Sequence, residues 1–394
     1  MADNMVVSFR SNIQRRRFEA LRQREMTLHI VPDSHTMVAL GISESVRFLI
    51  HQIGWESFAF SNLPIYRNLT LEFLSSFKYD PIYGKHLRRG LVSFRLFGNT
   101  YTYNHRDIAE FLGVPSGLDA ITRVQNDSFM EGELERYWGI ITGNPNAAPN
   151  ERFSSEIHNP AFRYFHMIIA HTFFGKAMNN TTVSQAELFM MFCVYQNRPI
   201  NAATFLLTNF VRIIEEPTHP ISIGGFVTFL ARAIGLHTPL SKIVPLGGMQ
   251  PMDLNLCFNY HMIENLGPNE FQLLINLVPV HHFTLPNSVR ISIHDKDNWL
   301  YDLEGQDESD PETPPLYHYT LGPPSPPHPA ASSTVPPTPA DHGATIATLQ
   351  TEIATLRTDF HNFMDLVIAQ LNRLTQDILS LRRRFPPADA PPSG

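Results

Sequence analysis

The sequence predicts a mostly α-helical protein: a helical globular body with a small β-hairpin, a proline-rich linker and a C-terminal coiled coil. Three observations predict this class. Helix caps and apolar residues at helical spacing recur through the first 300 residues. Proline becomes dense between residues 306 and 341. Apolar residues spaced strictly by three and four then follow, starting at Ile346.

Composition provides enough apolar material for a sizeable core, because 43% of the 394 residues are hydrophobic and 28 of them are Phe. We expect five segments. They are a basic N-terminal arm (1–29), a helical globular domain (30–301), an acidic and proline-rich linker (302–341), a coiled coil (342–385) and a disordered tail (386–394).

The N-terminal segment is strongly basic and predicts an amphipathic helix or arm, with Phe9, Ile13, Ala20 and Leu21 near one face. A solvated helix face is the simplest interpretation, and nuclear localisation or nucleic-acid contact is the alternative. The net charge of −7 restricts any such contact to a local patch. The arginines that would make it are Arg10, Arg15, Arg16, Arg17, Arg22 and Arg24.

Residues 92–103 alternate between apolar and polar side chains, which predicts a hairpin with Gly98 and Asn99 as its turn. Asn104 is expected to cap a helix through the amide of Asp107, and Gly113 should end that helix. The predicted unit is therefore a hairpin followed directly by a short helix.

Two of the next helices have clear start signals. Asn159 precedes proline and predicts a helix that runs to Gly175. Ser184 and Glu187 form a capping box that opens a largely buried helix, with Cys193 in the core.

Three further elements follow in the body. A helix is predicted at residues 226–234, after a glycine pair that we interpret as a turn, and another at 257–277. Residues 288–301 predict a short strand with Val289, Ile291 and Ile293 on one side.

The C-terminal apolar stripe has the spacing of a coiled-coil seam, with a four-residue stutter after Val367. The proline-rich sequences on both sides cannot bury this stripe, so it must pack against another chain or fold back on its own. We expect pairing with another copy of the chain, because a regular three-four seam is what helix–helix packing requires. The predicted contact residues are Ile346, Leu349, Ile353, Leu356, Phe360, Phe363, Val367, Leu371, Leu374, Ile378, Leu381 and Phe385.

No catalytic pattern is present in the sequence, so we expect no enzyme activity and no small-molecule substrate. Cys193 and Cys257 stand far apart, and His166 and His171 are five residues apart on a helix, which predicts core or surface imidazoles rather than metal ligands. The glycine pairs lack phosphate-loop spacing. We therefore expect no cofactor and no metal.

The N-terminal stretch MADNMVVSFRSNIQRRR lacks an apolar signal-peptide core, and no later apolar stretch has the length of a membrane span. We therefore expect an intracellular protein, cytoplasmic or nuclear, that is not secreted and does not contact a membrane.

Several blocks of the body resemble the plant retrotransposon first-open-reading-frame family known as Athila, over roughly residues 40 to 300. The hairpin and its helix also resemble, more faintly, the opening of the transposon-derived plant mobile domain. The Athila-like blocks are VSFRLFGNTYTYNHRDIAEFLGVP, WGIITG, HNPAFRYFHMIIAHTFFGK, VSQAELFMMFCV, GGFVTFLARAIGL and PLGGMQPMDLNLC.

The Athila resemblance implies an element-encoded structural protein, gag-like or envelope-like, with no catalytic residues to carry over. The sequence contains neither the zinc knuckle of a gag nucleocapsid nor the transmembrane helix of an envelope protein. Our leading hypothesis is a non-enzymatic assembly protein that self-associates through the coiled coil. The alternatives are a nucleic-acid-binding accessory protein, a host scaffold protein derived from the element, or an enzyme of unfamiliar type.

Overall fold

The structure, a computed structural model, describes residues 5–80, 90–114, 128–148, 150–218 and 220–301. These residues form fourteen α-helices, two short 3-10 helices and eight strands, all within one compact unit of the chain. The prediction of a mostly helical body is therefore confirmed. The β structure is richer than predicted, because the strands form three small sheets rather than one hairpin and one short strand.

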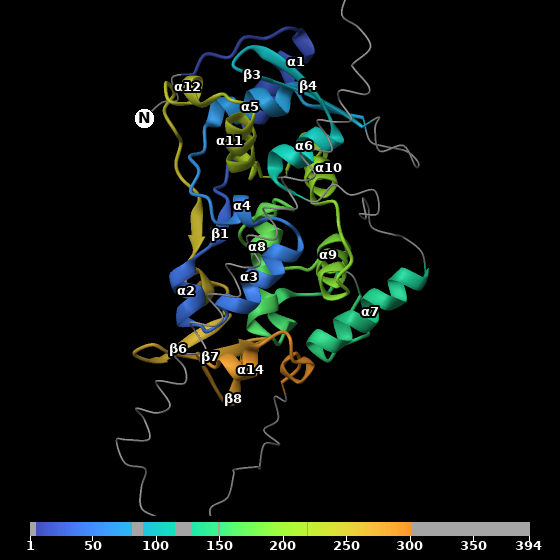
Figure 1. The fold of residues 1–394 in the computed structure, drawn as a ribbon, viewed down its shortest axis with the longest axis vertical. Coiled ribbons are helices and arrows are strands. Elements are labelled where there is room, and N and C mark those ends of the chain that lie inside the picture. The colour runs from blue at the N-terminus through green and yellow to red at the C-terminus, as the bar shows by residue number, and fades with distance from the viewer. Residues whose placement is uncertain (1–4, 81–89, 115–127, 149, 219, 302–394) are drawn as a thin grey trace, which may run out of the picture. The chain divides into compact units, whose positions relative to one another are not determined.

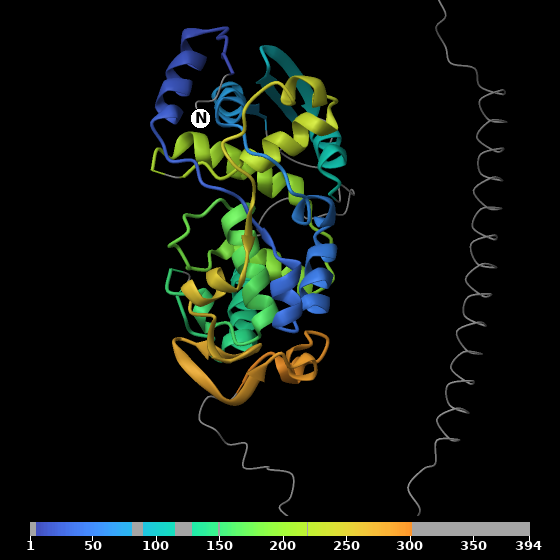
Figure 2. The same ribbon diagram turned by 90° about the vertical axis from the view of Figure 1, so that its left-hand side faces the viewer.

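One group of elements surrounds the N-terminal helix and the predicted hairpin (Figures 1 and 2). It comprises α1 (Asn12–Arg22), α5 (Arg67–Ser76), β2 (Lys78–Tyr79), β3 (Leu91–Leu96), β4 (Asn99–Asn104), α6 (His105–Leu112), α10 (Ala202–Glu215), α11 (Gly224–Ala233) and α12 (His237–Leu240). Helix α1 packs on α5, and α5 packs on β3. The expected N-terminal arm thus contains a helix that lies against the body.

A second group is built around α8, whose thirteen residues are all buried. Helices α3 and α9 both pack on α8, and α7 packs on α9 (Figure 1). The helices of this group are α2 (Ser34–Ala39), α3 (Ser43–Gln52), α4 (Glu56–Ala59), α7 (Ser128–Thr142), α8 (Pro160–Thr172), α9 (Gln185–Tyr195), α13 (Leu254–Asn259) and α14 (Ser288–Ile291), with 3-10 turns at Ser154–Glu156 and Lys296–Asn298.

Two small sheets complete the fold. Strands β1 (Ile30–Pro32) and β5 (Gln250–Met252) pair in parallel, and β1 packs against α8. Strands β6 (Ile263–Gly267), β7 (Glu270–Ile275) and β8 (Val278–Leu285) form an antiparallel meander, drawn in orange in Figure 2. Parallel pairing of segments 220 residues apart, as in β1 and β5, leaves no local trace in a sequence.

The hairpin is confirmed, but its predicted turn is wrong by one residue. Leu96 pairs with Asn99, so the turn residues are Phe97 and Gly98, with φ values of 51° and 79°. Two positive φ values in a two-residue loop are typical of a type I′ turn. Phe97 tolerates this conformation because Glu72 on α5 accepts hydrogen bonds from the amides of Phe97 and Gly98, both at 2.8 Å.

The predicted helix caps are confirmed. Asn104 accepts from the amide of Asp107 at 2.9 Å, and Gly113 ends α6 in the left-handed conformation. Asn159 caps α8, and the Ser184–Glu187 capping box opens α9, where Cys193 is fully buried. Capping depends on residues within one turn of one another, which is why it can be recognised in a sequence.

Two predictions near the end of the body are wrong. The segment at 257–277 is not one helix, because α13 ends at Asn259 and β6 and β7 follow. The sequence Gly267-Pro268-Asn269 breaks the helical pattern there, and Asn269 has a φ of 60°. The predicted strand at 288–301 is instead the single helical turn α14, which Asn287 caps through the amide of Arg290.

The glycine pair before α11 was interpreted as a turn, but Gly224 and Gly225 form the first turn of the helix itself and are buried. A Cβ on Gly224 would lie 2.3 Å from Ile65 Cγ2, and one on Gly225 would lie 2.4 Å from His29 Nδ1. The glycines are required by close packing rather than by a bend.

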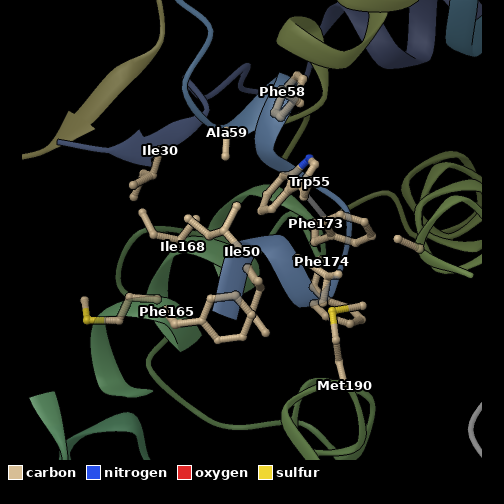
Figure 3. Packing of buried hydrophobic residues seen from close by; sticks show 14 of the residues in the cluster. Ile30, Ile50, Trp55, Phe58, Ala59, Phe165, Ile168, Phe173, Phe174 and Met190 are labelled. Atoms are coloured by element: carbon tan, nitrogen blue, oxygen red, sulfur yellow. The ribbon is translucent and has the colours of Figure 1, made fainter. Parts of the chain in front are cut away.

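The core is rich in aromatic side chains. Figure 3 shows Trp55, Phe58 and Phe173 from α4 and the end of α8 gathered beside Ile50 and Ile168. Phe58 stacks on Phe226 of α11 with ring centroids 4.0 Å apart, and Trp55 meets Phe173 edge-on at 4.8 Å. This cluster joins the two groups of helices.

Candidate nucleic-acid interface

Helix α1 carries most of the arginines predicted to contact nucleic acid. Its buried face consists of Gln14, Phe18 and Leu21. The predicted apolar face is therefore wrong in part, because Ile13 is 66% exposed and Gln14 takes the buried position. The arginines Arg10, Arg15, Arg16, Arg17 and Arg22 are exposed, whereas Arg24 is half-buried.

The exposed arginines differ in their partners. Arg22 lies 3.8 Å from Glu19, and the Arg15 guanidinium lies 5.4 Å from the centre of the Phe9 ring. Arg24 instead donates to the carbonyl oxygen of Ile213 at 2.5 Å. Burial lowers the pKa of Arg24, while nearby Glu216 raises it. Arg24 therefore ties the end of α1 to α10.

A cavity of about 410 Å³ lies beside the start of α1. Residues of α1, of the end of α5 and of strands β2, β3 and β4 line it. We call it the basic pocket. Four cationic residues line it, namely Arg10, Arg17, Lys78 and Arg95, together with five hydroxyl-bearing side chains. No acidic residue is among those that line it. The structure thus brings two of the predicted arginines together with two cations that the sequence analysis missed.

Arg95 lines the basic pocket and is only 6% exposed. Its Nη1 donates to the carbonyl oxygen of Ser8 at 2.7 Å and to Gln14 Oε1 at 2.9 Å. Its Nη2 donates to the carbonyl oxygen of Gly98 at 2.6 Å. All these acceptors are neutral, so Arg95 joins the segment before α1 to the hairpin without an ion pair.

Glu72 is the carboxylate that acts on Arg95 electrostatically, but it does not line the pocket. Both of its oxygens accept from the hairpin-turn amides. Burial raises the pKa of Glu72, and the two amides and Arg95 oppose that rise. The hydrogen-bonding capacity of Glu72 is therefore directed at the turn rather than at Arg95.

A second cavity, of about 520 Å³, lies beside the buried Arg163 of α8. The guanidinium donates to the carbonyl oxygens of Leu274, Tyr260 and His261 at 2.5, 3.1 and 2.9 Å. Burial lowers the pKa of Arg163 to about 10. These bonds join α8 to the β6–β8 sheet, which gives Arg163 a structural task.

The buried histidines of α8 adjoin an acidic and a basic side chain. His166 Nε2 lies 3.3 Å from Glu187 Oε2, and the same oxygen accepts from Lys176 Nζ at 2.7 Å. His171 Nε2 lies 3.2 Å from the hydroxyl of Tyr260. Both imidazoles are buried, which decides between the core and surface positions that the sequence left open. Over the part of the chain that the structure describes, no three His, Cys, Asp or Glu residues are arranged to hold a metal ion.

The twelve predicted coiled-coil contacts, Ile346 to Phe385, lie outside the described residues. None of the helices that the structure does describe combines the length and apolar character required to cross a bilayer. The cations that the sequence analysis missed, Lys78 and Arg95, are separated from α1 by more than 50 residues. Lys78 follows α5 directly and Arg95 lies in the predicted hairpin, but neither position signals proximity to α1.

Comparison with known proteins gives one family. Residues 20–196 match the model of the ATHILA ORF-1 family. That range contains four of the six blocks that carry the resemblance, including the hairpin unit, α8 and α9. The blocks GGFVTFLARAIGL and PLGGMQPMDLNLC lie beyond it. No match was found among curated proteins or solved structures. Over residues 20–196, this chain is therefore similar to the ATHILA ORF-1 family.

Proposed function

We propose that this retrotransposon-associated protein is a non-enzymatic assembly component that joins copies of itself through residues 342–385. The observation that supports the proposal is the apolar seam from Ile346 to Phe385, with its regular spacing of three and four. A linker between body and coiled coil would let several bodies act together, so weak contacts of each body would add in avidity.

Light scattering of the full chain at tens of micromolar tests this proposal. We expect a mass that is a multiple of the monomer, and a monomer for a chain that ends at residue 339. Ile353→Glu with Leu356→Glu should also give a monomer, because two charges would enter the seam. Thr351→Glu with Thr358→Glu adds the same charge at outward heptad positions and should leave the oligomer intact. A monomeric full chain would refute self-association.

A second candidate function, nucleic-acid binding by α1, is supported by a different observation. Five arginines are exposed on or just before one helix, and two of them line a pocket without acidic residues. Such a surface attracts phosphates locally, although the molecule as a whole has a charge of −7. The described body would then hold the nucleic acid, and the coiled coil would gather the bodies.

Fluorescence anisotropy with labelled RNA and DNA of mixed sequence tests the second function. We expect affinity to fall steeply with salt, and replacement of Arg15, Arg16 and Arg17 by Gln to reduce the slope. The control replaces the exposed residues Arg47, Arg106 and Arg136 by Gln, which removes equal charge from other elements. Absence of binding at low salt, or equal losses in both triple variants, would exclude α1 as the interface.

A further inference from the structure

We infer that the basic pocket binds one phosphate group of a nucleic-acid backbone, with Gln14, Arg17, Lys78 and Arg95 as its donors. The inference rests on the second proposed function and makes it specific. The binding surface would then be a defined pocket between α1, the end of α5 and the hairpin, rather than the exposed arginines of α1 in general.

The first observation concerns the amide of Gln14, which lines the pocket and is only 5% exposed. Its Oε1 accepts from the backbone N–H of Arg10 at 3.0 Å and from Arg95 Nη1 at 2.9 Å. Two donors on the oxygen fix the orientation of the amide. The Nε2 group is therefore held away from them, and it has no acceptor.

Arg95 provides a second donor of the same kind. Four of its contacts go to neutral oxygens through Nη1 and Nη2, while its buried Nε has no acceptor. A buried cation or amide without a full set of partners costs free energy that an acceptor would recover. Gln14 and Arg95 both line this cavity, and each retains one buried donor without an acceptor.

Charge and hydroxyl groups around the rim favour the same ligand class. Arg10, Arg17 and Lys78 are exposed cations of the lining, so a ligand can reach them from solvent. Ser11 caps the start of α1 within the lining, so the positive end of the helix dipole adds to their field. Multiple donors, four cations and no carboxylate in the lining fit a phosphate and its several oxygens.

The pocket has room for more than an isolated ion. Its volume of about 410 Å³ falls in the range of about 300–1,000 Å³ that is typical of ligand sites. Phe94, the aromatic residue of the lining, is completely buried and offers no face on which a base could stack. We therefore assign the pocket to a backbone phosphate and its sugar neighbours, bound without regard to base sequence.

The decisive comparison uses two double variants that remove equal charge. Arg17→Gln with Lys78→Gln removes two exposed cations of the pocket, and Arg15→Gln with Arg16→Gln removes two neighbours on α1 that do not line it. We expect the pocket variant to weaken binding of a labelled oligonucleotide about tenfold and the control variant about threefold or less. Thermal unfolding followed by circular dichroism should be unchanged in both, because all four side chains are exposed.

Inorganic phosphate is the second probe, since it shares the chemistry of the backbone. At constant ionic strength it should displace the oligonucleotide from the parent protein and the control variant. Equal weakening by the two variants would overturn the pocket while leaving nucleic-acid binding by α1 in place. A third outcome is that inorganic phosphate binding depends on Arg17 and Lys78 while oligonucleotide binding does not. That result would show that the pocket binds free phosphate and not the phosphate of a nucleic-acid backbone. Failure of the parent protein to bind any oligonucleotide would instead refute the second proposed function.

Discussion

The carboxylate of Glu187 and the ammonium group of Lys176 meet at 2.7 Å with side chains that are 0% and 8% exposed. Glu187 Oε2 also accepts from the amide of Ser184 at 2.7 Å and lies beside His166. Burial raises the pKa of Glu187, but the contacts with His166 and Lys176 outweigh it, so the pKa lies below its ordinary value. One capping residue thus also neutralises a cation in the core.

Replacement of Glu187 by Gln should therefore destabilise the body strongly. The change leaves the Lys176 ammonium buried without its counter-ion, and breaking a buried pair in this way costs about 3–5 kcal/mol. Urea unfolding of the variant measures the loss. Glu133→Gln is the matched control, because its partner Arg136 is 70% exposed and such a surface pair contributes only about 0.5 kcal/mol. Similar losses in both variants would contradict the assigned role of the buried pair.

Three buried histidines predict that the body loses stability in mild acid. Burial lowers the pKa of His29 to about 3 and the pKa values of His158 and His171 to about 4. An unfolded histidine titrates near pH ~6.5. Between these pH values the unfolded chain binds more protons than the folded chain. The free energy of unfolding therefore has its full value above pH ~6.5 and decreases as the pH is lowered toward the folded pKa values.

Urea unfolding at pH 7.5, 6 and 5 measures this loss, which we expect to reach about 1–2 kcal/mol for each histidine by pH 5. His29→Gln should flatten the pH dependence, because His29 Nδ1 accepts from the amide of Gly225 only while it is unprotonated. His35→Gln changes an exposed imidazole and should leave the dependence as it is. A body equally stable at pH 7.5 and pH 5 would show that these histidines protonate without unfolding.

The elements predicted correctly from sequence are those that short-range chemistry defines. Asn104, Asn159 and Ser184 cap helices through amides two or three residues away, and each is where the sequence placed it. Hairpin strands β3 and β4 are likewise local. The missed features depend on distant residues: the β1–β5 pair joins Ile30 to Gln250, and the turn at Phe97 depends on Glu72.

The candidate interface divides in the same way. The arginines of α1 form one local run of sequence, so they could be identified as a group. The pocket could not, because Lys78 and Arg95 reach it through the packing of α5 and the hairpin. Arg24 belongs to the same local run but has a different role, because it contacts the carbonyl oxygen of Ile213. That residue is 189 positions away in the sequence, so the contact could not be predicted.

Two glycine substitutions should change stability in opposite directions. Gly224→Ala would place a Cβ 2.3 Å from Ile65 Cγ2, and overpacking of this kind costs about 1–3 kcal/mol. Gly132→Ala lies in α7 with nothing within 4 Å of the new Cβ, so it should stabilise the body by about 0.5–1 kcal/mol through helix propensity. Thermal unfolding of the two variants measures both changes in stability. Stabilisation by Gly224→Ala would show that α11 does not pack this closely on Ile65.

The hairpin turn supplies the last prediction, because Glu72 is 0% exposed and accepts from two turn amides at once. In Glu72→Gln one carboxylate oxygen becomes an NH2 group, which cannot accept, so either Phe97 or Gly98 loses its acceptor. A buried donor left without a partner costs about 1–3 kcal/mol, which urea unfolding can measure. Glu110→Gln, at an exposed site on α6, should change stability by less than about 0.5 kcal/mol. If Glu72→Gln proved as mild as this control, the carboxylate would not be what holds Phe97 at a positive φ.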